Sequence, residues 1–119
     1  MANFNNLDLI VRDVPAATAF FRDVVGLTVR VGEQRFAELE SGAATIMLSP
    51  DAMVPTEPAR GVILHFEVED VIAALAHARG QGATVLLEST HTDWGTQSAM
   101  IAGPEGIVVD FFRPLAPPH

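Results

Sequence analysis

The sequence of 119 residues contains no cysteine, no tyrosine and no lysine. Without cysteine there is no disulfide framework, no thiolate metal site and no cysteine nucleophile. Without tyrosine there is no phenol to act as a catalytic acid, and without lysine there is no Schiff-base chemistry. The absence of cysteine suits a cytoplasmic protein, and the polar start of the chain (Asn3, Asn5, Asn6) leads us to expect no signal peptide.

Positive charge is also scarce, since seven arginines face fifteen acidic residues for a formal net charge of -8. Nucleic acid is therefore not an expected partner, because neutralising phosphates requires a basic face. Nor is a membrane, since no apolar run approaches the ~20 residues that span a bilayer. An acidic protein favours a cationic ligand, although the charge could equally serve only solubility.

A short pattern occurs twice, each time after an alternating apolar segment. Asp13-Val14-x-Ala16-Ala17 follows residues 7–11, and Asp70-Val71-x-Ala73-Ala74 follows residues 62–68. In both copies a strand pattern of period two leads into a helix whose first N–H groups an aspartate can cap. Apolar residues at helical spacing should face the sheet, and they are Ala17, Phe20, Phe21 and Val24 in the first helix and Val71, Leu75 and Ala78 in the second. The chain is therefore predicted to be two copies of one unit within a single domain.

The remaining patterns predict the order β-α-β-β-β in each copy. In the first copy we expect a strand at 7–11, a helix from 13 to 26, and strands at 27–31, 35–39 and 43–48. In the second we expect a strand at 62–68, a helix from 70 to 80, and strands at 84–88, 98–102 and 107–112. Module one is thus 1–49, module two is 62–113 and a tail is 114–119. The proline-containing segment 50–61 is either a linker or a surface loop.

Two sets of residues resemble the vicinal oxygen chelate superfamily, which includes glyoxalase I, extradiol dioxygenases, fosfomycin-resistance enzymes and bleomycin-resistance binding proteins. One is Val11-x-Asp13 leading to Phe20-Phe21-x-x-Val24-x-Gly26-Leu27; the other is Trp94-Gly95 leading to Gly103-Pro104-Glu105-Gly106-x-x-x-Asp110-Phe111. The resemblance covers nearly the whole chain. It implies an α+β fold of two βαβββ modules, with curved mixed sheets around a cup, and a homodimer.

The metal-dependent branches of that superfamily line the cup with four ligands, usually His or Gln, Glu, His and Glu. The resemblance places Asn6, Met47, Ile63 and Asp110 at those positions. Only Asp110 is a good ligand, because Met and Ile offer no hard donor to a divalent ion. The usual metal site is therefore expected to be absent, and no cofactor is predicted.

A shifted site is the alternative. Asp8 and His65 each lie two residues beyond a ligand position, on the same strand face, and they are equivalent in the two modules. Asp8, His65 and Asp110 could hold a divalent metal ion. Otherwise they form a polar pocket floor, which we favour because one histidine with two carboxylates is a poor transition-metal set.

Aromatic and apolar residues complete the predicted cup. Trp94, the only tryptophan, could stack on a planar or cationic ligand or could instead cover the sheet edge. Alternation places Phe112 beside Asp110 and turns Phe111 toward the helix. Met47, Met100 and Phe36 could line the cup or belong to the core. The predicted ligand-binding set is Trp94, Phe112, Asp110, His65, Asp8, Met47, Asn6 and Phe36.

These features predict a binding protein that sequesters an aromatic drug or natural product, which could be cationic or uncharged, without a metal. Such a protein would act in antibiotic resistance. The alternative is a metal-dependent lyase, isomerase or dioxygenase that uses the shifted ligands. Catalytic residues are left unassigned, because superfamily resemblance alone does not separate catalysts from binders.

Overall fold

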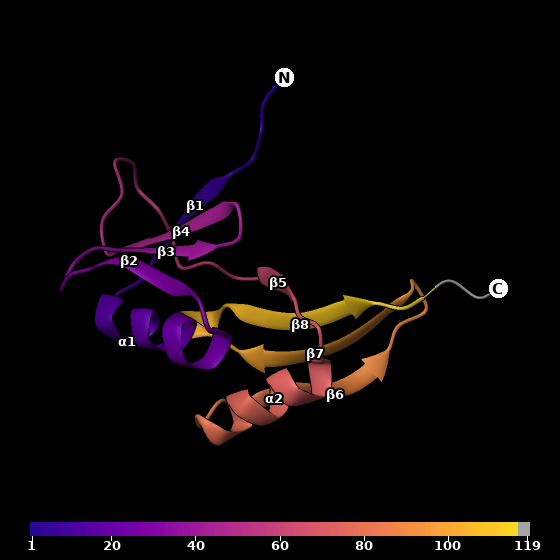
Figure 1. The fold of residues 1–119 in the computed structure, drawn as a ribbon. Coiled ribbons are helices and arrows are strands. Elements are labelled where there is room, and N and C mark those ends of the chain that lie inside the picture. The colour runs from indigo at the N-terminus through magenta and orange to yellow at the C-terminus, as the bar shows by residue number, and fades with distance from the viewer. Residues whose placement is uncertain (117–119) are drawn as a thin grey trace. The chain divides into compact units, whose positions relative to one another are not determined.

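The computed structural model describes residues 1–116, and the chain divides into two compact units, one of residues 1–59 and one that begins at Arg60 (Figure 1). The first unit contains β1 (Asn6–Ile10), α1 (Val14–Ala19), the π-helix η1 (Phe20–Val25), β2 (Thr28–Gly32), β3 (Ala37–Ser41) and β4 (Ala44–Ser49). The second contains β5 (Ile63–Glu67), α2 (Val71–Gly80), β6 (Val85–His91), β7 (Thr96–Ala102), the 3-10 turn η2 (Pro104–Gly106) and β8 (Val108–Pro114).

Both units have the same sheet topology. The strand orders are β1-β4-β3-β2 and β5-β8-β7-β6. The pairs β1–β4 and β5–β8 are parallel, and the other pairs are antiparallel. The sheets are open and mixed, which confirms the predicted pair of βαβββ modules. Residues 50–62 lie between the two sheets in sequence and form no helix or strand. The predicted tail, 114–119, begins inside β8, and its last three residues lie outside the described part of the chain.

Both helices begin where the repeated aspartates predicted. The Asp13 carboxylate accepts a hydrogen bond from the Ala16 N–H at 3.0 Å, and Asp70 accepts one from the Ala73 N–H at 3.0 Å. Each bond satisfies one of the N–H groups that a helix start leaves without an intrahelical partner. The helix α2 then buries the predicted stripe of Val71, Leu75 and Ala78.

The first helix differs from the prediction in its last turns, which are π-helical. The Gly26 N–H bonds the Phe21 carbonyl five residues back at 3.0 Å, and Gly26 ends the helix with a φ of 93°. The wider turn buries Phe21 fully and leaves Phe20 half-buried, packed edge-on against it with ring centroids 5.4 Å apart. Phe20 is therefore only partly on the predicted apolar face.

Alternation along the strands assigns one face of each sheet to the helix. In the second unit, α2 covers β6, β7 and β8, and the buried side chains on that side include Ala99, Ile101, Val109 and Phe111. The intervening residues of the same strands face the other way. That opposite face carries the candidate site. None of the helices within residues 1–116 is long and apolar enough to cross a membrane.

Phe111→Ala should lower the free energy of unfolding by about 3–5 kcal/mol, because Phe111 is 1% exposed and its loss leaves a cavity under α2. Urea unfolding measures the change. Phe4→Ala is the matched control: Phe4 is 81% exposed, so its removal should cost less than about 0.5 kcal/mol. Equal effects of the two substitutions would contradict the assignment of Phe111 to the core.

Candidate functional site

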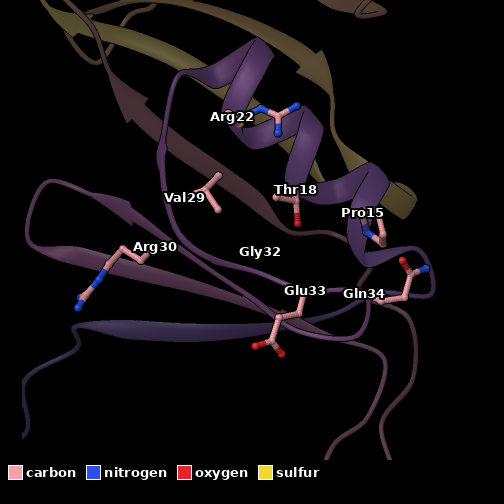
Figure 2. A pocket seen from close by; sticks show the side chains of 8 residues that line it. All are labelled: Pro15, Thr18, Arg22, Val29, Arg30, Gly32, Glu33 and Gln34. Atoms are coloured by element: carbon pink, nitrogen blue, oxygen red, sulfur yellow. The ribbon is translucent and has the colours of Figure 1, made fainter.

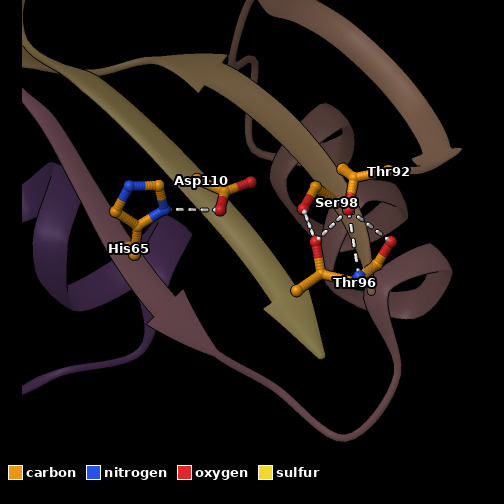
Figure 3. A network of polar contacts seen from close by, with 5 residues as sticks. All are labelled: His65, Thr92, Thr96, Ser98 and Asp110. Carbon is orange, nitrogen blue, oxygen red and sulfur yellow. Dashed lines mark hydrogen bonds and ion pairs between the residues drawn. The ribbon is translucent and has the colours of Figure 1, made fainter. Parts of the chain in front are cut away.

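The centre of the site is a hydrogen bond between neighbouring strands. The parallel register of β5 and β8 places His65 beside Asp110, and His65 Nδ1 lies 2.7 Å from Asp110 Oδ2 (Figure 3). Asp110 faces away from α2 because Val109 and Phe111, on either side of it, are buried against that helix. The Asp110 side chain is 3% exposed, whereas that of His65 is 56% exposed. The pair therefore joins a buried carboxylate to an accessible imidazole.

The second oxygen of Asp110 has no partner. Asp110 Oδ1 is the one buried side-chain nitrogen or oxygen in residues 1–116 that makes no hydrogen bond, and it points away from His65 (Figure 3). Leaving a buried polar atom unpaired costs about 1–3 kcal/mol, and more when the group is charged. A native structure keeps such an atom chiefly where a ligand, ion or water completes it. Oδ1 is thus a free acceptor at the site.

Aromatic and apolar side chains surround this carboxylate. A cavity of about 250 Å³ is lined by His65, Trp94, Thr96, Ser98, Met100, Asp110 and Phe112. Met100 of β7 lies opposite Asp110 in the sheet register, and the Phe112 ring packs edge-on against His65 with centroids 6.1 Å apart. Trp94, in the turn between β6 and β7, lines the cavity although it is 75% exposed. Four of the eight predicted site residues thus meet here.

Two cavity residues, Thr96 and Ser98, were not predicted. They belong to a hydroxyl network in which Thr92 Oγ1 lies 2.8 Å from Thr96 Oγ1, and Thr96 Oγ1 lies 3.0 Å from Ser98 Oγ (Figure 3). The Thr96 N–H also donates to Thr92 Oγ1 at 3.0 Å, which closes the turn that carries Trp94. Thr96 and Ser98 alternate with Met100 along the strand, and this spacing indicates that all three side chains share one face. The strand predicted at 98–102 began too late to include Thr96.

The other four predicted residues belong to the first unit. Asp8 of β1 pairs in register with Met47 of β4, as His65 does with Asp110, so Asp8 and His65 are equivalent as predicted. Asn6, at the start of β1, donates to Asn5 Oδ1 at 2.7 Å. Phe36 is half-buried just before β3. The lining of the 250 Å³ cavity comes entirely from the second unit, so these four residues stay predictions.

The first unit has a larger cavity of about 530 Å³ between α1, η1 and β2, and its two arginine side chains are already paired (Figure 2). Arg22 forms two hydrogen bonds to Asp23, which lower the pKa of that carboxyl, and Arg30 lies 3.0 Å from Glu40. The Thr18 hydroxyl donates to the Val14 carbonyl at 2.8 Å. Among the described residues that line this cavity, no buried side-chain nitrogen or oxygen lacks a hydrogen-bond partner, in contrast to Asp110 Oδ1.

The donor set does not fit the metal site of the metal-dependent branches. Of Asn6, Met47, Ile63 and Asp110, only Asp110 supplies an anionic oxygen, and His65 already occupies its Oδ2. Within residues 1–116 no three His, Asp or Glu side chains are grouped so that they could hold a metal ion. No step through a metal is therefore derived.

Known proteins match both the sequence and the fold. The family model of the Glyoxalase/Bleomycin resistance protein/Dioxygenase superfamily matches residues 3–111. No curated protein matches the sequence. A solved structure described as a conserved domain protein is 38% identical with a TM-score of 0.87, over 95% of this chain and 99% of that one.

Two further solved structures share the fold at lower identity. TnmS3, an antibiotic-binding protein from Streptomyces sp. CB03234, is 22% identical with a TM-score of 0.78, over 96% of this chain and 97% of that one. TioX from Micromonospora sp. ML1 is 19% identical with a TM-score of 0.76, over 96% of this chain and 100% of that one. At these identities the likeness shows the fold alone.

His65→Ala should lower the free energy of unfolding by about 1–3 kcal/mol, because it removes the hydrogen bond that satisfies Asp110 Oδ2. Adding Asp110→Leu to that variant should restore the loss, since an apolar side chain of similar volume needs no partner. Urea unfolding of both variants measures this. If His65→Ala left stability unchanged, the bond would contribute nothing to the fold.

Proposed function

We propose that this chain, which belongs to the Glyoxalase/Bleomycin resistance protein/Dioxygenase superfamily, is a small-molecule binding protein that sequesters an aromatic, in particular a cationic aromatic, drug or natural product without a metal. The observation that carries the proposal is Asp110, which lines a cavity walled by Trp94, Met100 and Phe112 and whose buried Oδ1 has no hydrogen-bond partner. A ligand cation that donates to Oδ1 would pair both the atom and its charge.

The size of the cavity supports a ring rather than a whole drug as the buried part. An apolar cavity of roughly 150 Å³ can hold benzene, whereas sites for drug-sized ligands are about 300–1,000 Å³. The cavity beside Asp110, at about 250 Å³, fits one substituted ring. The remainder of a larger ligand would extend past Trp94, which is 75% exposed at the rim.

The energies indicate which contact should dominate. A hydrogen bond to a charged group contributes about 1.5–3 kcal/mol. An exposed cation–π contact, as at Trp94, contributes about 0.5–1 kcal/mol. Asp110 should therefore set the preference for a cation, and Trp94 and Phe112 should set the preference for a flat ring.

The antibiotic-binding neighbour TnmS3 supports a ligand-binding role at the level of the family. We extend the proposal to the remaining predicted contacts, Asn6, Asp8, Phe36 and Met47, as further ligand-facing residues. Formation of a homodimer and a contribution to antibiotic resistance stay predictions that follow from the resemblance, and a cytoplasmic location stays a prediction that follows from the absence of cysteine.

Benzamidine tests the charge preference with a single ring. Its amidinium should bind Asp110 and quench Trp94 fluorescence saturably, and it should bind about tenfold or more tightly than the uncharged benzamide, which has nearly the same shape. Because Trp94 is the only tryptophan, the signal reports this cavity alone.

Asp110→Asn should weaken benzamidine binding about 10- to 100-fold, because it removes the charge while keeping the shape of the side chain. Glu57→Gln changes the net charge equally at an exposed position outside the cavity and should leave binding unchanged. Equal affinities for benzamidine and benzamide, or an equal effect of the two variants, would exclude Asp110 as the anchor.

Elemental analysis of protein purified without chelators separates binding from the metal-dependent alternative. We expect far less than one metal ion per chain, and we expect added divalent ions to leave benzamidine binding unchanged, because the donors around Asp110 are too few. Stoichiometric metal that is lost in His65→Ala would favour the shifted site of Asp8, His65 and Asp110 instead.

A further inference from the structure

The two ring nitrogens of His65 differ, because one is hydrogen-bonded to Asp110 and the other is not. Nδ1 faces Asp110 Oδ2 at 2.7 Å, and Nε2 points away from the carboxylate (Figure 3). The oxygens of an ionised carboxylate only accept hydrogen bonds, so Nδ1 must donate to Asp110. In a neutral imidazole this places the lone pair on Nε2. The bond to Asp110 thus selects the tautomer in which the exposed nitrogen is the acceptor.

Two contacts, one to Asp110 and one to Phe112, hold the imidazole ring of His65 in place. A proton arriving at Nε2 makes an imidazolium whose charge is balanced by the Asp110 carboxylate, which is 2.7 Å from the ring and shielded from water. Phe112 packs edge-on against the imidazole and limits its rotation. The His65 side chain is 56% exposed and lines the cavity, so a bound ring can reach it.

We propose that His65 is a general base acting on the ligand bound in this cavity, with Asp110 as its positioning residue. The inference rests on the proposed function, since it requires a ring in the same cavity. Nε2 takes a proton from an acidic C–H of the bound ring, the C–H electron pair forms a new π bond to the neighbouring ring atom, and the bond from that atom to the leaving group breaks, with its electron pair staying on the leaving group. The substrate class is a flat heteroaromatic with an acidic C–H that carries its own leaving group.

The probe 5-nitro-1,2-benzisoxazole isolates this step. Loss of its C3 proton to a base forms the nitrile while the ring N–O bond breaks, and the electron pair ends on the phenolate oxygen of 2-cyano-4-nitrophenol. No oxidant, metal or second substrate is needed, and the phenolate is coloured. Wild-type protein should open the ring with a kcat/KM about 100-fold or more above that of His65→Gln, since a positioned base contributes about 10²–10⁴-fold.

His65→Gln is chosen because its amide N–H₂ can still donate to Asp110 Oδ2, which keeps the carboxylate satisfied and the variant folded. The matched control is His77→Ala, which removes an exposed histidine from α2 on the other side of the sheet and should leave the rate unchanged. Equal rates for wild type and His65→Gln would overturn the proposal.

Asp110→Asn tests the positioning role. Its amide can donate to Nδ1 and so move the hydrogen onto Nε2, where it blocks the base. We expect kcat to fall about 100-fold or more, as for loss of the base itself, while KM for this uncharged probe is unchanged. A loss in KM alone would mean that Asp110 only shapes the cavity, which would overturn its assigned role.

The two proposals fail by different measurements. If benzamidine binds as expected but the isoxazole is opened no faster than by His65→Gln, the cavity binds ligands and His65 is not a base. If the isoxazole is opened in a His65-dependent way but benzamidine and benzamide bind equally, the base stands and the preference for cations falls.

Discussion

The parallel pairing of β5 with β8 is the constraint on which the site depends. Backbone hydrogen bonds from Val108 to Val62 and from Val68 to Phe112 bracket this pairing at 3.0 and 2.8 Å. Between them the register sets His65 beside Asp110 and turns both away from α2. A slip of one residue would place Leu64 beside Asp110 and turn alternate side chains of the strand to the wrong face. The burial of Val109 and Phe111 under α2 makes such a slip costly.

The same burial explains how the chain tolerates an unpaired carboxylate oxygen. The strand β8 is held by a buried apolar side chain on either side of Asp110, each worth about 1.5–3 kcal/mol when fully buried. That exceeds the cost of about 1–3 kcal/mol for one unsatisfied polar atom. One buried polar atom on β8 therefore lacks a hydrogen bond while its apolar neighbours are well packed. This is the pattern expected of a functional site.

Elements that depend on hydrophobic periodicity and on helix caps were predicted from the sequence. Strand ends and turns that depend on hydrogen bonds between nearby polar groups were not. The repeated aspartates, the buried faces of the helices, and Phe112 beside Asp110 all follow from spacing. Residues 89–91 and 96–97 looked like loop because they are polar. Their polar groups bond one another across β6 and β7, as in the 2.9 Å bond from Gln97 to Ser89, so the strands continue. The π-helical turn likewise ends with hydrogen bonds from the Gly26 and Leu27 N–H groups to the Phe21 carbonyl, which no spacing reveals.

The matching strand registers of the two units also bear on how the chain arose. A chain whose halves share strand order, helix position and capping aspartate is most simply explained by duplication of one ancestral half-gene. After such an event either copy can drift while the other keeps its role. Here one copy has histidine beside aspartate where the other has Asp8 beside Met47. Two substitutions, Asp8→His and Met47→Asp, would give both halves the same residues at these positions, so the two halves differ at this pair by only two side chains.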